Sequence, residues 1–125
     1  MVSILILMIL FHIIDDFVLQ PICLSKLKKK SFWQEQNLDN NLYKNDYLAS
    51  LIILHGLSWS AMVHIPTMYL FNFEHQLALL ISFLVHAIIH AMIDDLKANK
   101  KTINLITDQT LHLIQIILIF ISIPT

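Results

Sequence analysis

Apolar residues run almost unbroken through four stretches of the chain, and polar residues gather between them. The stretches cover residues 1–24, 47–71, 77–93 and 103–123. Each is close to the roughly 20 residues that a helix needs to cross a bilayer core. The runs show no alternation of period two, and a helix satisfies its backbone amides within its own segment. The pattern therefore predicts an all-α, four-helix transmembrane bundle that forms a single domain over residues 1–125.

The composition supports this prediction and excludes several other classes of protein. Hydrophobic residues make up 57% of the 125 residues and charged residues 14%, and the mean hydropathy is +0.69. A soluble domain of this size carries about a quarter charged residues because its surface faces water. One Gly, three Pro and one Cys argue against a disordered chain and against a disulfide-stabilised fold. We therefore expect a multi-pass protein whose main partner is the lipid bilayer.

The positions of the basic residues predict how the spans are oriented. The chain has eight basic residues, and all of them are lysines. They lie only between the first and second stretches (Lys26, Lys28, Lys29, Lys30 and Lys44) and between the third and fourth (Lys97, Lys100 and Lys101). Because positively charged loops remain on the cytoplasmic side of a membrane, we expect a cytoplasmic loop over residues 25–46 and both termini outside.

The loop over residues 25–46 also predicts a class of partner. Its lysines are followed by Phe32 and Trp33, a combination that suits the headgroup layer of an anionic membrane. Anionic lipids are therefore expected partners. Nucleic acid is not, because the chain has no arginine to read base edges. A homo-oligomer is compatible with the sequence, since four short helices enclose little volume.

Polar residues inside the predicted spans repeat one arrangement, an imidazole and a carboxylate one helical turn apart. The residues concerned are His12, Asp16 and Gln20 in the first span, His55 in the second, His86, His90, Asp94 and Lys97 in the third, and Asp108, Gln109 and His112 in the fourth. From the helical rise, the carboxylates and most of the imidazoles lie roughly 5–20 Å from the lysine-bearing side. We therefore expect one His/Asp cluster near the cytoplasmic side and almost no polar residues in the outer half.

Such a cluster suits a divalent metal ion. A carboxylate in the bilayer core costs on the order of 3 kcal/mol, and a bound cation can offset this. Imidazole and carboxylate together favour zinc, with manganese or iron as alternatives. The expected metal ligands are His12, Asp16, His86, His90, Asp94, Asp108 and His112, which together could serve one or two ions. His55 is expected to act as a ligand or general base, and Lys97 with Gln20 or Gln109 to hold an anionic headgroup.

A purely structural explanation stands beside this one. A single buried His/Asp pair more often just joins two helices by a hydrogen bond. Three such pairs at one depth favour a functional site. We interpret His64 and His75 as interfacial and structural residues, and Asp15 and Asp95 as interfacial or supporting residues rather than ligands.

The order of these motifs is similar to that of a known family. H-x3-D-F-x2-Q begins at His12, a lone histidine follows at His55, H-x3-D-x2-K begins at His90, and D-Q-x2-H begins at Asp108. This set resembles the family called domain of unknown function 3307, from bacteria and their phages, over nearly the whole chain. The resemblance implies a bacterial inner-membrane protein and no particular activity. A looser similarity of the His/Asp pattern to inner-membrane metal-dependent hydrolases implies hydrolysis.

Three functions remain open at this point. The first is a metal-dependent hydrolase at the cytoplasmic leaflet, acting on a lipid or polyprenyl phosphate. The second is a proton or metal-ion transporter or channel, against which the apolar outer half argues. The third is a non-catalytic phage membrane effector, an exclusion or lysis factor, in which the cluster only holds the helices together.

Overall fold

The four expected spans are present as helices in the computed structural model, which describes residues 2–20, 22–36, 41–70 and 75–122. The helical segments Val2–Leu19, Asp46–Tyr69, Gln76–Ala98 and Leu105–Ser122 are each long and apolar enough to cross a membrane. The described residues contain no strand. This confirms the prediction of four apolar spans.

Only two of the spans are uninterrupted α-helices, α6 (Gln76–Ala98) and α7 (Leu105–Ser122). The first span combines α1 (Val2–Ile14) with a π-helical turn, η1 (Asp15–Leu19). The second combines α4 (Asp46–Ala49), a longer π-helical segment η2 (Ser50–Gly56), and α5 (Leu57–Leu70). Both π-helical segments carry residues of the expected cluster. Such segments occur frequently at functional sites.

Two boundaries differ from the expectation. The first span ends at Leu19, and a separate short helix, α2 (Ile22–Leu27), follows it. Because proline removes a backbone donor and crowds the preceding turn, Pro21 is expected to kink the first span or end its regular part, and it lies outside the described residues. The third span continues past residue 93 to Ala98, because its polar end remains helical while Asp94 faces the interior. The loop over residues 25–46 contains a further helix, α3 (Lys30–Glu35).

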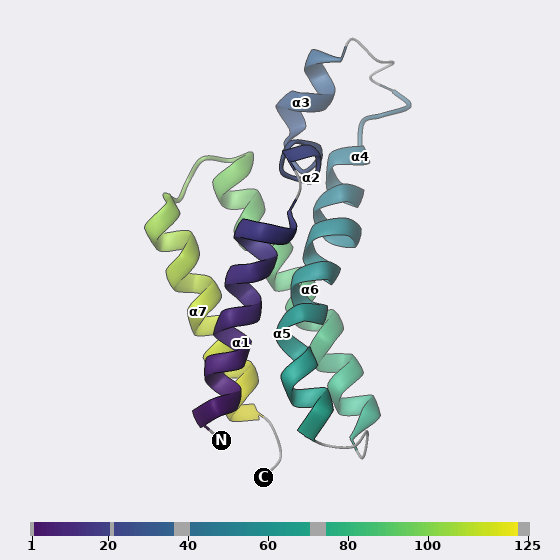
Figure 1. The fold of residues 1–125 in the computed structure, drawn as a ribbon. Helices are drawn as coiled ribbons and strands as arrows, with labels where there is room; N and C mark the ends of the chain where they lie inside the picture. The colour runs from purple at the N-terminus through teal and green to yellow at the C-terminus, as the bar shows by residue number, and fades with distance from the viewer. Residues whose placement is uncertain (1, 21, 37–40, 71–74, 123–125) are drawn as a thin grey trace.

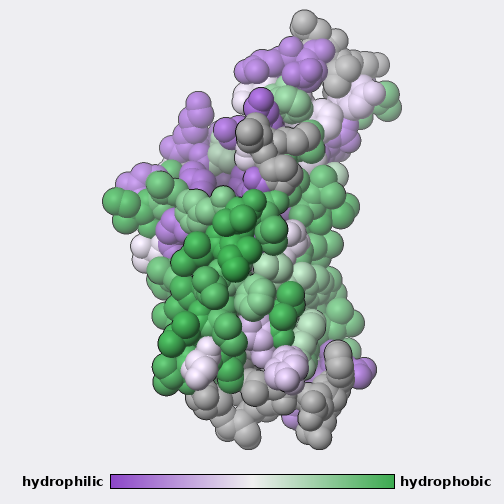
Figure 2. Space-filling model, in the orientation of Figure 1, coloured by the Kyte–Doolittle hydropathy of each residue, from purple (hydrophilic) through white to green (hydrophobic). Residues whose placement is uncertain are grey.

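The spans lie side by side as a bundle, with α1 packed on α5 and α7, and α5 packed on α6 (Figure 1). The start of α1 and the end of α7 lie at one end of the bundle, opposite α2 and α3 (Figure 1). We call the end with α2, α3 and the α6–α7 connection the lysine-bearing end. The visible surface is hydrophilic there and largely hydrophobic along the spans (Figure 2).

The apolar core is small and lies toward the end of the bundle away from the lysines. It consists of the buried side chains Ile4, Met8, Trp59, Val63, Ile116 and Ile119. Many other large apolar side chains are exposed, including Ile6, Met92 and Ile117. A soluble protein rarely exposes apolar area on this scale, whereas lipid covers it in a membrane. The interior toward the lysine-bearing end is polar instead.

Gly56, the one glycine of the chain, sets how closely the second and third spans approach. A Cβ at this position would lie 2.6 Å from the carbonyl oxygen of Ala87 and 3.4 Å from the Cβ of Ala91. Small residues at a helix interface allow backbones to come this close. Because His55 precedes Gly56 and His90 lies between Ala87 and Ala91, this contact also brings the two imidazoles together.

We predict that Gly56→Ala separates these spans and lowers the free energy of unfolding by about 1–3 kcal/mol, the range typical of overpacking. Unfolding in mixed detergent micelles, followed by circular dichroism, measures the change. Ala49→Leu enlarges an exposed position of the same span and serves as the control. Equal stability of Gly56→Ala and the wild type would contradict the close approach.

Candidate metal centre

Asp94 of α6 lies at the centre of the polar interior and is only 1% exposed. Its carboxylate pairs with the ammonium group of Lys28, the residue after α2, and with Nε2 of His55 from η2. Its other oxygen, Oδ1, lies 3.3 Å from Nε2 of His112 from α7. Partners from three other parts of the chain therefore converge on one carboxylate. A buried charge requires such compensation.

His90, one turn before Asp94, links the imidazoles of the cluster. Its Nδ1 lies 3.1 Å from Nδ1 of His112, and its Nε2 lies 3.0 Å from Nε2 of His55. All three rings are fully buried. The indole of Trp59 stacks on the His90 ring, with centroids 4.2 Å apart and planes 13° apart. This stacking fixes the plane of the ring and therefore the direction of both nitrogens.

Two groups of side chains have the geometry to hold a metal ion. One consists of His90, Asp94 and His112, and the other of Asp16, His55 and His90. Within each group the potential ligand atoms all lie within 4.8 Å of one another. Ligands about 2.0–2.1 Å from a tetrahedral zinc are about 3.4 Å apart. The separation of 3.3 Å between His112 and Asp94 is close to this value.

Around these groups, the remaining polar residues form a connected network. Lys97 pairs with Asp108 and lies 3.9 Å from Asp94. The amide of Gln109 donates to Asp108 at 3.1 Å and to Asp16 at 3.3 Å. Two further hydrogen bonds close the network, from Gln20 Nε2 to Asp16 Oδ1 at 3.2 Å and from Lys28 Nζ to Gln20 Oε1 at 3.5 Å. Lys97 and both glutamines, the expected headgroup ligands, are thus each engaged with a carboxylate.

The charges of this interior do not balance if the imidazoles are neutral. Asp15, Asp16, Asp94 and Asp108 contribute four carboxylates. Among the described residues, Lys28 and Lys97 are the ammonium groups paired with them. A divalent cation would neutralise the excess, and an imidazolium would reduce it. Four buried side-chain atoms also lack a hydrogen-bond partner within the described chain: Oδ2 of Asp15, Nδ1 of His55, Oδ1 of Asp108 and Oε1 of Gln115.

His12 lies beside the cluster but has both ring nitrogens engaged. The indole N–H of Trp59 donates to its Nδ1 at 2.7 Å, so its Nε2 carries the proton and faces Oε1 of Gln109 at 3.2 Å. Both nitrogens of His12 are thus engaged in this arrangement, and His12 is in neither of the two groups that could hold a metal ion. Asp15 is buried in η1 and accepts a hydrogen bond from Ser58 at 2.7 Å.

A second polar group lies further from the lysine-bearing end, where we expected almost none. His64 is fully buried rather than interfacial, and its Nδ1 donates to the carbonyl of Ser60 at 2.8 Å while its Nε2 accepts from Ser82 at 3.0 Å. His86, expected as a metal ligand, accepts from Gln115 at 3.1 Å and is in neither metal group. Serines and single histidines on separate spans give no repeated spacing that a sequence pattern could reveal.

Two residues of the centre were missed in the sequence analysis. Lys28 was interpreted only as part of the topology signal, yet it is buried against Asp94. Trp59 was not assigned a role, yet it contacts the rings of His12, His90 and His112. A usable signal for Trp59 was its position four residues after His55 in the same span, which places both on one face.

The comparisons with known proteins identify a family and no activity. The family model described as "Protein of unknown function (DUF3307)" matches residues 4–125, which include every residue of the centre. No curated protein and no solved structure matches the chain.

We predict that Asp94→Asn lowers the free energy of unfolding by about 3–5 kcal/mol, because it leaves the buried ammonium of Lys28 unpaired. Asp95→Asn is the matched control: Asp95 pairs with the exposed Lys100, and the expected change is below about 1 kcal/mol. Adding Lys28→Met to Asp94→Asn should restore part of the loss, since both charges are then removed. Detergent unfolding curves of the four proteins provide the test. Equal effects of the two Asn variants would contradict the assignment.

Proposed function

We propose that this chain, which belongs to the DUF3307 family, is a membrane-embedded, metal-dependent hydrolase. The observation that carries the proposal is the buried group of His90, Asp94 and His112, whose ligand atoms converge from two helices. Ordinary helix packing needs one hydrogen bond between two spans, whereas here imidazoles and carboxylates from every span converge. We place the centre in a bacterial inner membrane, at the cytoplasmic leaflet, because the lysines lie at the same end.

The donor set fits zinc best, with manganese or iron as alternatives. When bound, the metal would polarise a phosphoryl or acyl oxygen and activate water for attack at neutral pH. His90 and Asp94 would hold it from α6 and His112 from α7, and the Asp16–His55–His90 group offers a second position. Gln109 and Lys97 would hold the carboxylates of Asp16 and Asp108 in place.

His55 is the proposed general base. Its Nε2 faces both Asp94 and His90, while its Nδ1 has no hydrogen-bond partner among the described residues. An imidazole held in this way can accept a proton from water at one nitrogen while the other stays with the cluster. At this depth a substrate must itself enter the bilayer, which favours a lipid or polyprenyl phosphate. The phosphate headgroup of such a substrate would be held by Lys97 with Gln20 or Gln109. Each of these side chains would give up its contact with a carboxylate and bind the phosphate instead.

We predict that detergent-purified protein carries close to one equivalent of zinc, manganese or iron, or takes it up on supplementation. The double variant Asp94→Ala, His112→Ala should lose the metal because it removes two of the three ligands of one group. Elemental analysis beside a circular dichroism spectrum measures metal content and folding together. Asp95→Asn, on the same helix and outside both groups, is the matched control.

A second variant makes this test sharper. Lys28→Gln frees an oxygen of Asp94 and removes a nearby positive charge, so it should bind metal more tightly than the wild type. If neither the wild type nor Lys28→Gln takes up metal, the hydrolase proposal fails. If metal binds but phosphatase and lipase assays with the wild type give no turnover above the double variant, the site is a metal site without the proposed chemistry.

The polar group in the outer half favours transport as the second candidate. Gln115 and His86 follow His112 away from the centre, and the His86 ring lies 6.2 Å from that of His64. Ionisable residues that continue across a bundle commonly mark a proton or ion path. His64, Ser82 and His86 also line a cleft of about 430 Å³ in this half.

If the protein conducts protons, His86→Leu should lower the proton flux at least tenfold, because it removes the link between the two polar groups. The measurement is the acidification of proteoliposomes that contain a pH-sensitive dye. His75→Gln, at an exposed position just before α6, is the control. Flux no greater than in protein-free liposomes, or flux unchanged in His86→Leu, would exclude this candidate.

A further inference from the structure

A pocket of about 470 Å³ lies at the lysine-bearing end, between α3 and the start of α4. Its walls include Lys30, Trp33, Gln34, Tyr43, Lys44 and Tyr47. None of these residues belongs to the metal groups or to the hydrogen-bonded network of the centre. The pocket is therefore a separate feature of the molecule, and the proposed function makes no use of it.

The aromatic side of the pocket is built from fixed rings. Trp33 and Tyr43 stack with centroids 6.2 Å apart and planes 15° apart. The indole N–H of Trp33 donates to the carbonyl of Leu27 at 2.7 Å, which holds its ring against the preceding helix. The backbone N–H of Lys30 donates to Oδ1 of Asn99 at 2.7 Å, so the start of α3 is tied to the end of α6. The pocket thus has preformed walls.

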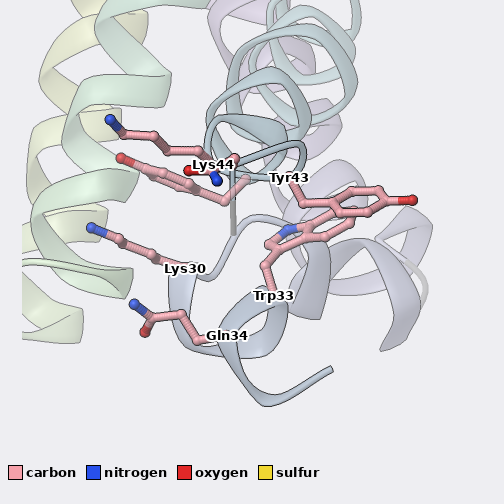
Figure 3. A pocket seen from close by; sticks show the side chains of 7 residues that line it. Lys30, Trp33, Gln34, Tyr43 and Lys44 are labelled. Atoms are coloured by element: carbon pink, nitrogen blue, oxygen red, sulfur yellow. The ribbon is translucent and has the colours of Figure 1, made fainter. Parts of the chain in front are cut away.

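The other side of the pocket is positively charged. Lys30, Gln34 and Lys44 extend in the same direction, away from the stacked rings (Figure 3). No acidic side chain lines the pocket in the described part of the chain. Lys28, Lys97 and Lys100 each pair with an aspartate, whereas no ion pair within the described residues engages Lys30 or Lys44. Two ammonium groups without an ion pair, on the same side of one pocket and together with an amide, are suited to a phosphate group.

A mostly apolar groove is lined by residues that follow those of the pocket in the sequence. Tyr47 lines the pocket, and the next residue, Leu48, lines a groove of about 140 Å³ between the second and third spans. The groove continues along Leu51, Ile52, Ala91, Met92 and Leu96, and the ion pair of Asp95 with Lys100 lines the rest of it. Its apolar residues belong to helices long and apolar enough to cross a membrane. The pocket and the groove are therefore lined by consecutive residues, Tyr47 and Leu48, with polar side chains around the one and mostly apolar side chains around the other.

We propose that this pocket and groove bind one anionic phospholipid. Lys30 and Lys44 hold its phosphate, and Gln34 donates to the polar headgroup. Trp33 and Tyr43 occupy the headgroup layer, where amphipathic rings are favoured. One acyl chain follows the groove along Met92. A soluble phosphate ester would use only the pocket, so the groove selects a lipid as the occupant. The inference does not depend on the metal centre.

The experiment is mass spectrometry of the intact full-length protein released from detergent, titrated with phosphatidylglycerol or phosphatidylcholine of the same acyl chains. We expect phosphatidylglycerol to bind at least tenfold more tightly. A lysine near an anionic headgroup contributes roughly a fivefold change in Kd, so Lys30→Gln with Lys44→Gln should weaken binding roughly 25-fold. Lys26→Gln with Lys29→Gln removes the same charge from exposed positions outside the pocket, and less than a twofold change is expected.

The role of the groove is tested by a separate pair of variants, one inside the groove and one outside it. Met92→Ser should weaken phosphatidylglycerol binding several-fold because it removes apolar surface from the groove. Ile88→Ser, exposed one turn earlier on the same helix and outside the groove, should not. If both double lysine variants weaken phosphatidylglycerol binding equally, general surface charge accounts for the binding, and the proposal is overturned. Competition by glycerol phosphate at the affinity of the lipid would overturn the role of the groove.

Lipid binding by His112→Ala separates this inference from the proposed function. The variant removes a ligand of the metal centre and keeps the Lys28–Asp94 pair that holds α2 against the bundle, so phosphatidylglycerol should bind it as tightly as the wild type. Loss of lipid binding in this folded variant would show that the lipid is held by the metal centre, and the pocket would not be the site.

Discussion

The polar interior depends on one constraint, a carboxylate buried among apolar spans at Asp94. In hydrocarbon, an unpaired carboxylate is expensive, and partners must come from the protein itself. Asp94 obtains them from Lys28, His55 and His112, so α2, the second span and the fourth span all have to meet α6 at this residue. The connection after the first span is held by the same requirement, because Lys28 reaches Asp94 only if α2 folds back against the bundle. The centre therefore fixes the arrangement of the lysine-bearing end more than apolar packing does.

Irregular backbone is needed to satisfy this constraint. In an uninterrupted α-helix each residue advances by about 100°, which puts residues four apart nearly in line. The π-helical segments η1 and η2 change this register at Asp15 and at His55. As a result Asp15 faces Ser58 in the interior, and His55 reaches both Asp94 and His90. Gly56 completes the approach by allowing the second span to contact the backbone of Ala87.

The sequence predicts the spans well because a helix long and apolar enough to cross a bilayer is recognised from its own residues and not from its packing partners. It also identifies most of the centre, since His90–Asp94 and Asp108–His112 are pairs within one helix. It fails where position depends on another segment. His86 shares a face with His90 but lies about 6 Å further along the helix, which is too far to share its partners. Lys28 lies in a loop whose return to the bundle has no local signature, and His64 and Ser82 meet only through packing of two spans.

The arrangement of charges argues for a ligand-binding centre over a purely structural one. A network that only joined helices would be most stable with its charges balanced, because each excess buried charge opposes folding. Here, with neutral imidazoles, carboxylates outnumber the ammonium groups paired with them, and imidazole nitrogens face one another at 3.0 and 3.1 Å. Two imidazole nitrogens at this separation need a proton or a cation between them, since their lone pairs otherwise repel. Trp59 and Gln109, in turn, hold His12 in a single tautomer beside the cluster. Supporting residues that fix ring orientation in this way are typical of the surroundings of metal sites.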